Sequence, residues 1–263
     1  MKFIKYLLAG CMLAAVLSGC RRQTSAQAIA TAGNHATEQD TLTNLQSTDN
    51  AASSPKPMPS VKSKTARYLD SLGFINIAEA DSSIAVDLMY THADNFTGQV
   101  LYEDLHEAYL HPEAMESLLK AQELLKKSHP GYSLIVYDAA RPMSVQQKMW
   151  NAVKGTPEYM YVSNPAQGGG LHNYGLAVDI SILDEQGQPL SMGTPVDYLG
   201  MEAHITQEEQ LVRTGKITAQ ELENRRLLRK AMREAGFRPL PSEWWHFNRV
   251  SRQTAKEKYR IIP

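Results

Sequence analysis

Hydrophobic residues recur with helical or strand spacing from about residue 65 to residue 263. After Pro112, apolar side chains at i, i+4, i+7 and i+11 predict an amphipathic helix. A capping box formed by Thr218 and Glu221 predicts the start of another helix, which ends at Gly236. The apolar stripes are Ala114, Leu118, Ala121 and Leu125 in the first helix and Leu228, Ala231, Met232 and Ala235 in the second.

A shorter helix and four strands complete the predicted elements. Ser144 with Gln147 three residues on matches a capping box and predicts a helix over residues 145–152. Runs of strand composition cover residues 84–90, 132–137, 175–182 and 244–250. Because these elements do not alternate regularly as βαβ units, we expect an α+β fold with a mainly antiparallel central sheet flanked by helices.

The first residues have the pattern of an export signal. Two lysines precede an apolar run over residues 6–17, which is too short to span a bilayer comfortably, so residues 1–19 are predicted to be a signal peptide. Residues 17–20, Leu-Ser-Gly-Cys, resemble the lipobox of bacterial lipoproteins, in which the cysteine is acylated and begins the mature chain. The alternative is an ordinary signal peptide. Lipidation of Cys20 implies a membrane-anchored protein of the cell envelope, on its periplasmic or outer-surface side.

Composition then changes at the lipidated cysteine. Residues 20–64 are rich in small and polar residues and are predicted to be a disordered tether. Residues 65–263 are predicted to form the folded domain. The chain holds 27 Lys+Arg and 28 Asp+Glu, a balance that argues against a nucleic-acid partner. Its two cysteines, Cys11 and Cys20, both lie in the export segment, so the mature chain would keep no free thiol for catalysis or a disulfide.

Two short segments, residues 168–181 and 242–247, stand out as candidates for chemistry. They contain His172, Asp179, Glu243 and His246, which are the side chains of a catalytic zinc site: three ligands, and a carboxylate that moves protons. In a regular strand, residues three apart face opposite ways. Glu243 must therefore lie in a turn, or the strand must twist, if it is to share a metal with His246. The alternative is a buried histidine paired with a neighbouring acid.

The spacing of these residues resembles a known family. His172-x-x-Gly175-x-Ala177-x-Asp179 followed by Glu243-Trp-Trp-His246 is similar to the paired signature of the zinc D,D-peptidases of the M15/hedgehog-like type. The closest similarity is to the D-alanyl-D-alanine dipeptidase branch. Further matching segments lie at residues 87–90, 95–98, 137–142 and 192–197, so the resemblance covers about residues 74–250 in the same order.

The resemblance implies a role for each matching residue. His172, Asp179 and His246 would hold one Zn²⁺ per chain. Glu243 would act as the general base, taking a proton from the attacking water and giving it to the leaving amine. Arg141 would stabilise the developing oxyanion.

Two further positions bear on the choice of substrate. Asp197 would hold the free ammonium of a dipeptide; from the bare sequence it could equally be a turn residue. The family commonly has Ser two residues before the first histidine, where this chain has Gly170, and this departure bears on substrate preference.

The sequence therefore predicts a membrane-tethered zinc dipeptidase that hydrolyses D-Ala-D-Ala or a related D,D-dipeptide outside the cytoplasm. Two alternatives remain open. One is a D,D-carboxypeptidase or peptidoglycan endopeptidase on the same scaffold. The other is a non-catalytic cell-wall binding module, which would have no need of Glu243.

Overall fold

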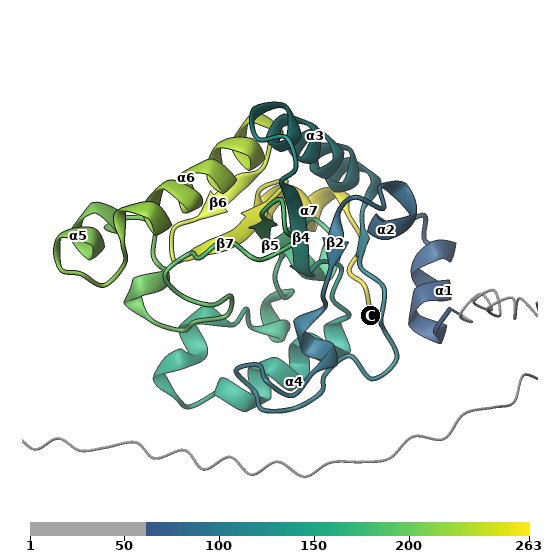
Figure 1. Cartoon of the computed structure of the whole chain (residues 1–263). Coiled ribbons are helices and arrows are strands. Elements are labelled where there is room, and N and C mark those ends of the chain that lie inside the picture. Colours follow the sequence, from purple (N-terminus) through teal and green to yellow (C-terminus); the bar gives the residue numbers. More distant parts are fainter. Residues whose placement is uncertain (1–61) are drawn as a thin grey trace, which may run out of the picture. The chain divides into compact units, whose positions relative to one another are not determined.

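A five-stranded sheet forms the centre of the fold, in the order β2-β4-β5-β7-β6 (Figure 1). The computed structural model describes residues 62–263. β2 pairs with β4 in parallel, and the remaining neighbours are antiparallel. A separate antiparallel pair is formed by β1 and β3. The strands are β1 Ile75–Asn76, β2 Ala85–Val86, β3 Tyr109–Leu110, β4 Ser133–Asp138, β5 Ala177–Leu183, β6 Arg238–Leu240 and β7 Glu243–Asn248.

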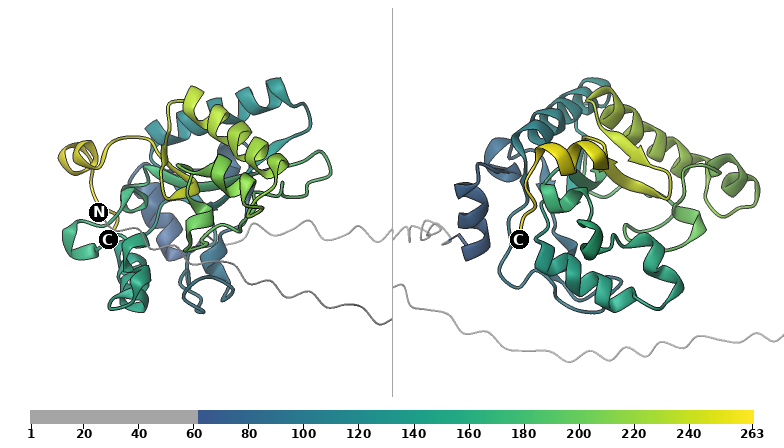
Figure 2. Two further views of the ribbon diagram at one scale, coloured as in Figure 1. Left: turned by 90° about the vertical axis from the view of Figure 1, so that its left-hand side faces the viewer. Right: turned by 180° about the vertical axis from the view of Figure 1, so that it is seen from behind.

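Helices lie on both sides of this sheet. α3 and α6 pack against each other along one side, whereas α4 lies on the opposite side (Figures 1 and 2). The α-helices are α1 Lys64–Ser71, α2 Ile77–Ala80, α3 Pro112–Ser128, α4 Met143–Val153, α5 Glu208–Arg213, α6 Ala219–Glu234 and α7 Arg252–Lys258. Short 3-10 helices are η1 Met89–Thr91, η2 Pro157–Tyr161, η3 Pro165–Gln167, η4 Leu171–Tyr174 and η5 Met201–Ala203. The predicted α+β class with a mainly antiparallel sheet is confirmed.

The central strand β5 is buried on both of its faces, and the two faces differ in polarity. Val178, Ile180 and Ile182 are fully buried and point to one face, because successive strand residues alternate. Asp179 and Ser181 are also buried, and they point to the other face. The central strand therefore carries polar chemistry on one side only.

Two of the predicted helices are confirmed in detail. α3 begins at Pro112 and buries the predicted apolar stripe. α6 begins after Thr218, whose side chain accepts from the backbone N–H of Glu221 while the Glu221 carboxylate accepts from that of Thr218. This is the reciprocal pair expected of a capping box.

Two local predictions were wrong. Pro142, not Ser144, precedes α4, and no side chain caps that helix. The first N–H of the helix, that of Met143, donates instead to the Ile262 carbonyl at 2.9 Å. The run predicted as a strand over residues 84–90 pairs only at β2 and then turns into η1. Tertiary contacts of Tyr90, which lies in η1 and is buried, take precedence over its strand propensity.

The predictions for the start of the chain fall outside the described residues. They concern the signal peptide (residues 1–19), lipidated Cys20 and the tether up to residue 61. Between residues 62 and 263, no helix has the length and apolar character needed to cross a membrane.

Candidate active site

Three side chains predicted as metal ligands lie together at the middle of the sheet. His172 comes from η4, Asp179 from β5 and His246 from β7. Asp179 and His246 sit directly opposite each other in the antiparallel pair of strands. His246 Nδ1 is 2.9 Å from Asp179 Oδ1, and His172 Nε2 is 3.3 Å from Asp179 Oδ2 and 3.2 Å from His246 Nδ1. The structure therefore brings one ligand atom from each residue to a common centre.

A tight turn before β5 places His172. Gly175 ends η4 in the left-handed region, at φ 64°. A Cβ on Gly175 would overlap the ring of Phe74, so both the backbone conformation and the space require glycine. His172 Nδ1 lies 2.7 Å from the Ala139 carbonyl oxygen. Because a carbonyl can only accept, Nδ1 carries the proton and Nε2 presents its lone pair to the cluster.

An irregularity in β7 brings Glu243 and His246 to the same cavity. Pro239 of β6 pairs with Phe247, but the next residue, Leu240, pairs with Glu243. One step along β6 therefore corresponds to four steps along β7, and the bulge re-aims the side chains. Glu243 Oε2 lies 3.9 Å from His246 Nδ1, and both residues line the cavity. In a regular strand, Glu243 and His246 would face opposite sides of the sheet, and this bulge allows both to face the cavity.

The charges of the cluster favour a cation. Burial alone would raise the pKa of Asp179, but His172 and His246 lower it well below its ordinary value. Burial alone would lower the pKa of His246, yet the hydrogen bond and negative charge of Asp179 raise it to about 9. Two imidazole nitrogens and one carboxylate oxygen, all buried, are a donor set that suits Zn²⁺. The residues present fit such an ion.

Glu243 has the surroundings of a proton carrier. Its side chain is 13% exposed, and burial raises the pKa of its carboxyl to about 7, with a smaller upward contribution from Asp179. A carboxyl that titrates near neutral pH can both accept and donate a proton under the same conditions. It lines a cavity of about 370 Å³ together with Arg141 and Asp197.

Arg141 is held by partners that the sequence analysis did not identify. Asp138 is completely buried and accepts from Arg141 Nε at 2.9 Å and from Nη2, and it also accepts from the Tyr102 hydroxyl at 2.5 Å. Gln146 Oε1 accepts from Arg141 Nη1 at 2.9 Å. A guanidinium has five N–H donors. Three are used here, so two remain without a partner among the described residues, and Arg141 lines the cavity.

Asp197 lies on a loop that is anchored from several sides. It is the non-glycine residue of the described chain with a positive φ, 63°, a strained conformation often found at functional sites. The Tyr90 hydroxyl donates to Asp197 Oδ2 at 2.5 Å. Burial, with a smaller contribution from the charge of Asp179, raises the pKa of Asp197 to about 7 against the opposing effect of the Tyr90 hydrogen bond. Asp197 therefore lies in a turn, as one interpretation of the sequence expected, and it also lines the cavity.

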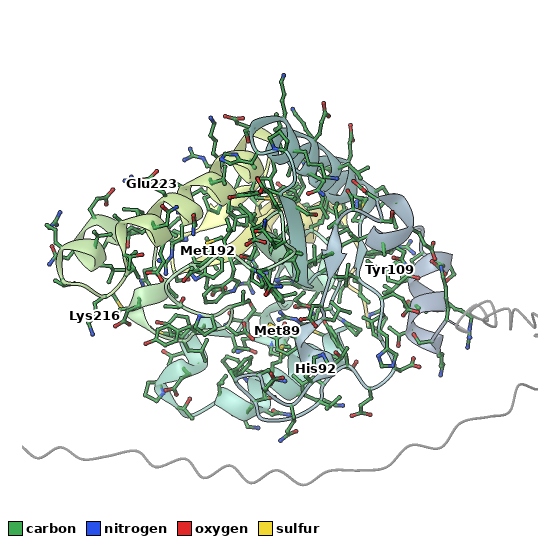
Figure 3. All side chains as sticks on the ribbon, in the orientation of Figure 1. Met89, His92, Tyr109, Met192, Lys216 and Glu223 are labelled. Carbon is green, nitrogen blue, oxygen red and sulfur yellow. The ribbon has the colours of Figure 1, made fainter. Side chains whose placement is uncertain are left out.

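The anchor of this loop comes from α6. Arg225 donates from Nε to the Met192 carbonyl at 2.6 Å and from Nη2 to the Glu202 carbonyl at 3.0 Å, so it holds both ends of the segment that carries Asp197. Figure 3 shows Met192, at the start of this loop, beside the inner side of α6, whereas Glu223 of α6 lies on the outer, exposed side of the helix.

Two of the residues that position the site lie in the segments that match the family, but the sequence does not reveal their function. Tyr90 and Asp138 lie within residues 87–90 and 137–142, and their partners Asp197 and Tyr102 are far away in the sequence. Gln146 carries no motif at all. Only a pairing of a buried acid with Arg141 three residues later could have been suspected from spacing.

Comparison with known proteins finds a family match that includes all the residues of the candidate site. Residues 70–261 match the M15 peptidase family, whose description is D-ala-D-ala dipeptidase. A protein of Escherichia coli (strain K12) described as D-alanyl-D-alanine dipeptidase is 31% identical over 178 residues, 68% of this chain and 85% of that protein. Proteins of the same description from Synechocystis sp. and Enterococcus faecium are 30% and 28% identical, and the matches cover 71% and 91% of those proteins.

Proposed function

The chain belongs to the M15 peptidase family of D-Ala-D-Ala dipeptidases, and on this basis we propose that it is a zinc-dependent dipeptidase that hydrolyses D-Ala-D-Ala or a closely related D,D-dipeptide outside the cytoplasm. One observation carries the proposal. His172, Asp179 and His246 converge on one centre, and Glu243 faces the same cavity.

The residues of the chain divide the reaction between them. His172, Asp179 and His246 would hold the zinc ion, which when bound supplies a Lewis acid and lowers the pKa of water to about 7. Glu243 takes a proton from the attacking water and passes it to the leaving amine. The two N–H donors of Arg141 that Asp138 and Gln146 leave unused stabilise the oxyanion that develops on the scissile carbonyl.

Asp197 would select the dipeptide. Its carboxylate binds the free ammonium of the substrate, which a longer or acylated peptide lacks at that position. Glu243 argues against the alternative of a binding module without catalysis, because a proton carrier beside the ligands has no structural purpose. Arg141 likewise lines the cavity and keeps two N–H donors that Asp138 and Gln146 do not use.

The cellular location is a separate proposal that rests on the sequence alone. We propose that Cys20 is acylated and anchors the protein to a membrane of the cell envelope. Several acyl chains on one residue bind a membrane firmly, at about 0.8 kcal/mol per buried CH₂.

Substrate length provides the first test. D-Ala-D-Ala should be hydrolysed, whereas an N-acylated tripeptide ending in D-Ala-D-Ala should not, because it offers no ammonium to Asp197. Release of D-alanine from both is measured side by side. Preferential cleavage of the tripeptide would support the D,D-carboxypeptidase alternative and contradict the dipeptidase proposal.

Measurement of bound zinc distinguishes the proposed metal ligands from the proposed general base. The purified protein should contain about one zinc per chain, as measured by mass spectrometry of the metal. His172→Ala should lose both zinc and activity, whereas Glu243→Gln should keep zinc and lose about 10²–10⁴-fold in kcat. His106→Ala, at an exposed position, serves as the control. Full activity of the metal-free wild type would exclude a metallopeptidase.

Tyr90→Phe should shift the pH dependence of KM. The Tyr90 hydroxyl stabilises the ionised form of Asp197, so its removal raises the pKa of that carboxyl further above about 7. Less carboxylate is then available at pH 7, and KM should rise about tenfold and recover as the pH is raised, because a hydrogen bond to a charged group contributes roughly 1.5–3 kcal/mol. Tyr259→Phe removes a hydroxyl that bonds to Glu113 and is the control. An unchanged pH profile of KM would contradict the role of Asp197.

Acylation is tested by labelling cells with a radioactive fatty acid. The full chain should be labelled and should sediment with membranes. Cys20→Ser should abolish both, whereas Cys11→Ser should abolish neither, because Cys11 lies in the segment removed during export. Absence of label on the wild type would refute the anchor.

A further inference from the structure

A loop between α4 and η4 folds back so that Ser163 faces Gly170. The turn is closed by hydrogen bonds from the backbone N–H of Gly168 to the Pro165 carbonyl and from that of Gly169 to the Asn164 carbonyl. Gly168 and Gly169 both have a positive φ, 85° and 63°, which reverses the chain direction. The two ends of the loop, residues 163 and 170, are thereby brought together at the wall of the cavity.

Space, and not backbone strain, explains the glycine at position 170. Gly170 has φ −107° and ψ −177°, an extended conformation that any residue adopts. A Cβ at this position, however, would lie 2.9 Å from Ser163 Oγ and 3.4 Å from Ser163 Cβ. The Ser163 hydroxyl therefore occupies the space that a side chain of residue 170 would need.

Ser163 is fixed by the same network that holds Arg141. Gln146 Nε2 donates to the Ser163 carbonyl at 2.9 Å, and Gln146 Oε1 accepts from Arg141 Nη1. Gln146 is only 1% exposed, so this bridge is rigid. Among residues 62–263, the bond from Gln146 holds Ser163 by its backbone carbonyl and does not engage the hydroxyl.

We propose that the Ser163 hydroxyl is a substrate-binding group of this enzyme, which donates a hydrogen bond to an oxygen of the bound dipeptide from the corner that Gly170 leaves open. Ser163 lines the cavity together with Arg141, Glu243 and Asp197. A dipeptide presents two kinds of oxygen, the scissile carbonyl and the terminal carboxylate, and a hydroxyl can donate to either. This inference rests on the proposed function and adds a specificity residue to it.

Ser163→Ala is the first variant. Loss of one hydrogen bond to the substrate should lower kcat/KM about tenfold to a hundredfold. A rise in KM alone assigns the bond to the terminal carboxylate, which is present equally in ground and transition states. A fall in kcat assigns it to the scissile carbonyl, where charge develops during the reaction. Ser144→Ala, at an exposed serine of α4, is the matched control and should be unaffected.

A stronger test transfers the hydroxyl from residue 163 to residue 170. Gly170→Ser alone should lower activity, because its Cβ is crowded by Ser163 Oγ. Combined with Ser163→Ala, it should recover most of the activity lost in Ser163→Ala, since the double variant removes the crowding atom and restores a hydroxyl at the same corner. Zinc content and Tm are measured for every variant, to separate a substrate contact from a structural role.

The outcomes are distinguishable. The inference is overturned if Ser163→Ala stays within about twofold of the wild type, if its loss of activity is accompanied by loss of zinc or of Tm, or if the folded double variant is no more active than Ser163→Ala. Binding of D-Ala-D-Ala is measured in parallel by calorimetry. A wild type that binds the dipeptide without hydrolysing it contradicts the proposed function alone, and the effect of Ser163→Ala on Kd then decides the inference. A wild type that binds no dipeptide contradicts both.

Discussion

Asp179 places a carboxylate at the centre of a sheet, where only 3% of the residue is exposed. An ionised carboxylate in such a position is costly unless positive charge or hydrogen-bond donors surround it. Here His246 and His172 lie within 2.9 Å and 3.3 Å of its two oxygens, and Arg141 Nη2 lies 3.8 Å away. The negative charge of Asp179 therefore requires positively charged or hydrogen-bonding neighbours, and it favours binding of a cation by the cluster.

A second buried carboxylate, on the neighbouring strand β4, also needs a positively charged partner. Asp138 lies opposite Asp179 in the β4–β5 pair, so two acids occupy adjacent strands at the same level. Two neighbouring carboxylates would repel each other, and the guanidinium of Arg141 between them offsets that repulsion. Removing one member of a buried ion pair costs about 3–5 kcal/mol, so Arg141 stabilises the fold in addition to its role in the proposed reaction. Its orientation is set by Asp138 and Gln146, which leave two of its N–H donors unused at the wall of the cavity.

How much of this could be predicted depends on how local each feature is. The helices over α3 and α6 were predicted because an apolar stripe and a capping box are contained in consecutive residues. The four side chains of the centre were found because their spacing matches a family signature. The bulge in β7 could not be predicted, since it depends on how β6 pairs with β7. The contact of Ser163 with Gly170 likewise exists only after the loop has closed, and the proline start of α4 was mistaken for a serine cap.

Selection of a dipeptide requires a rigid ammonium site, because an acid on a mobile loop would accept substrates of many lengths. The loop that carries Asp197 is held at Met192 and Glu202 by Arg225, and in between by Trp244, whose Nε1 donates to Thr194 Oγ1 at 2.8 Å. Trp244 adjoins Glu243 at the start of β7, so the strand that aims the proton carrier also fixes the loop of Asp197. The separation between Asp197 and Glu243 is thereby fixed by contacts from both α6 and β7. In the proposed function, that fixed separation limits the substrate to two residues, and it does so without closing the cavity.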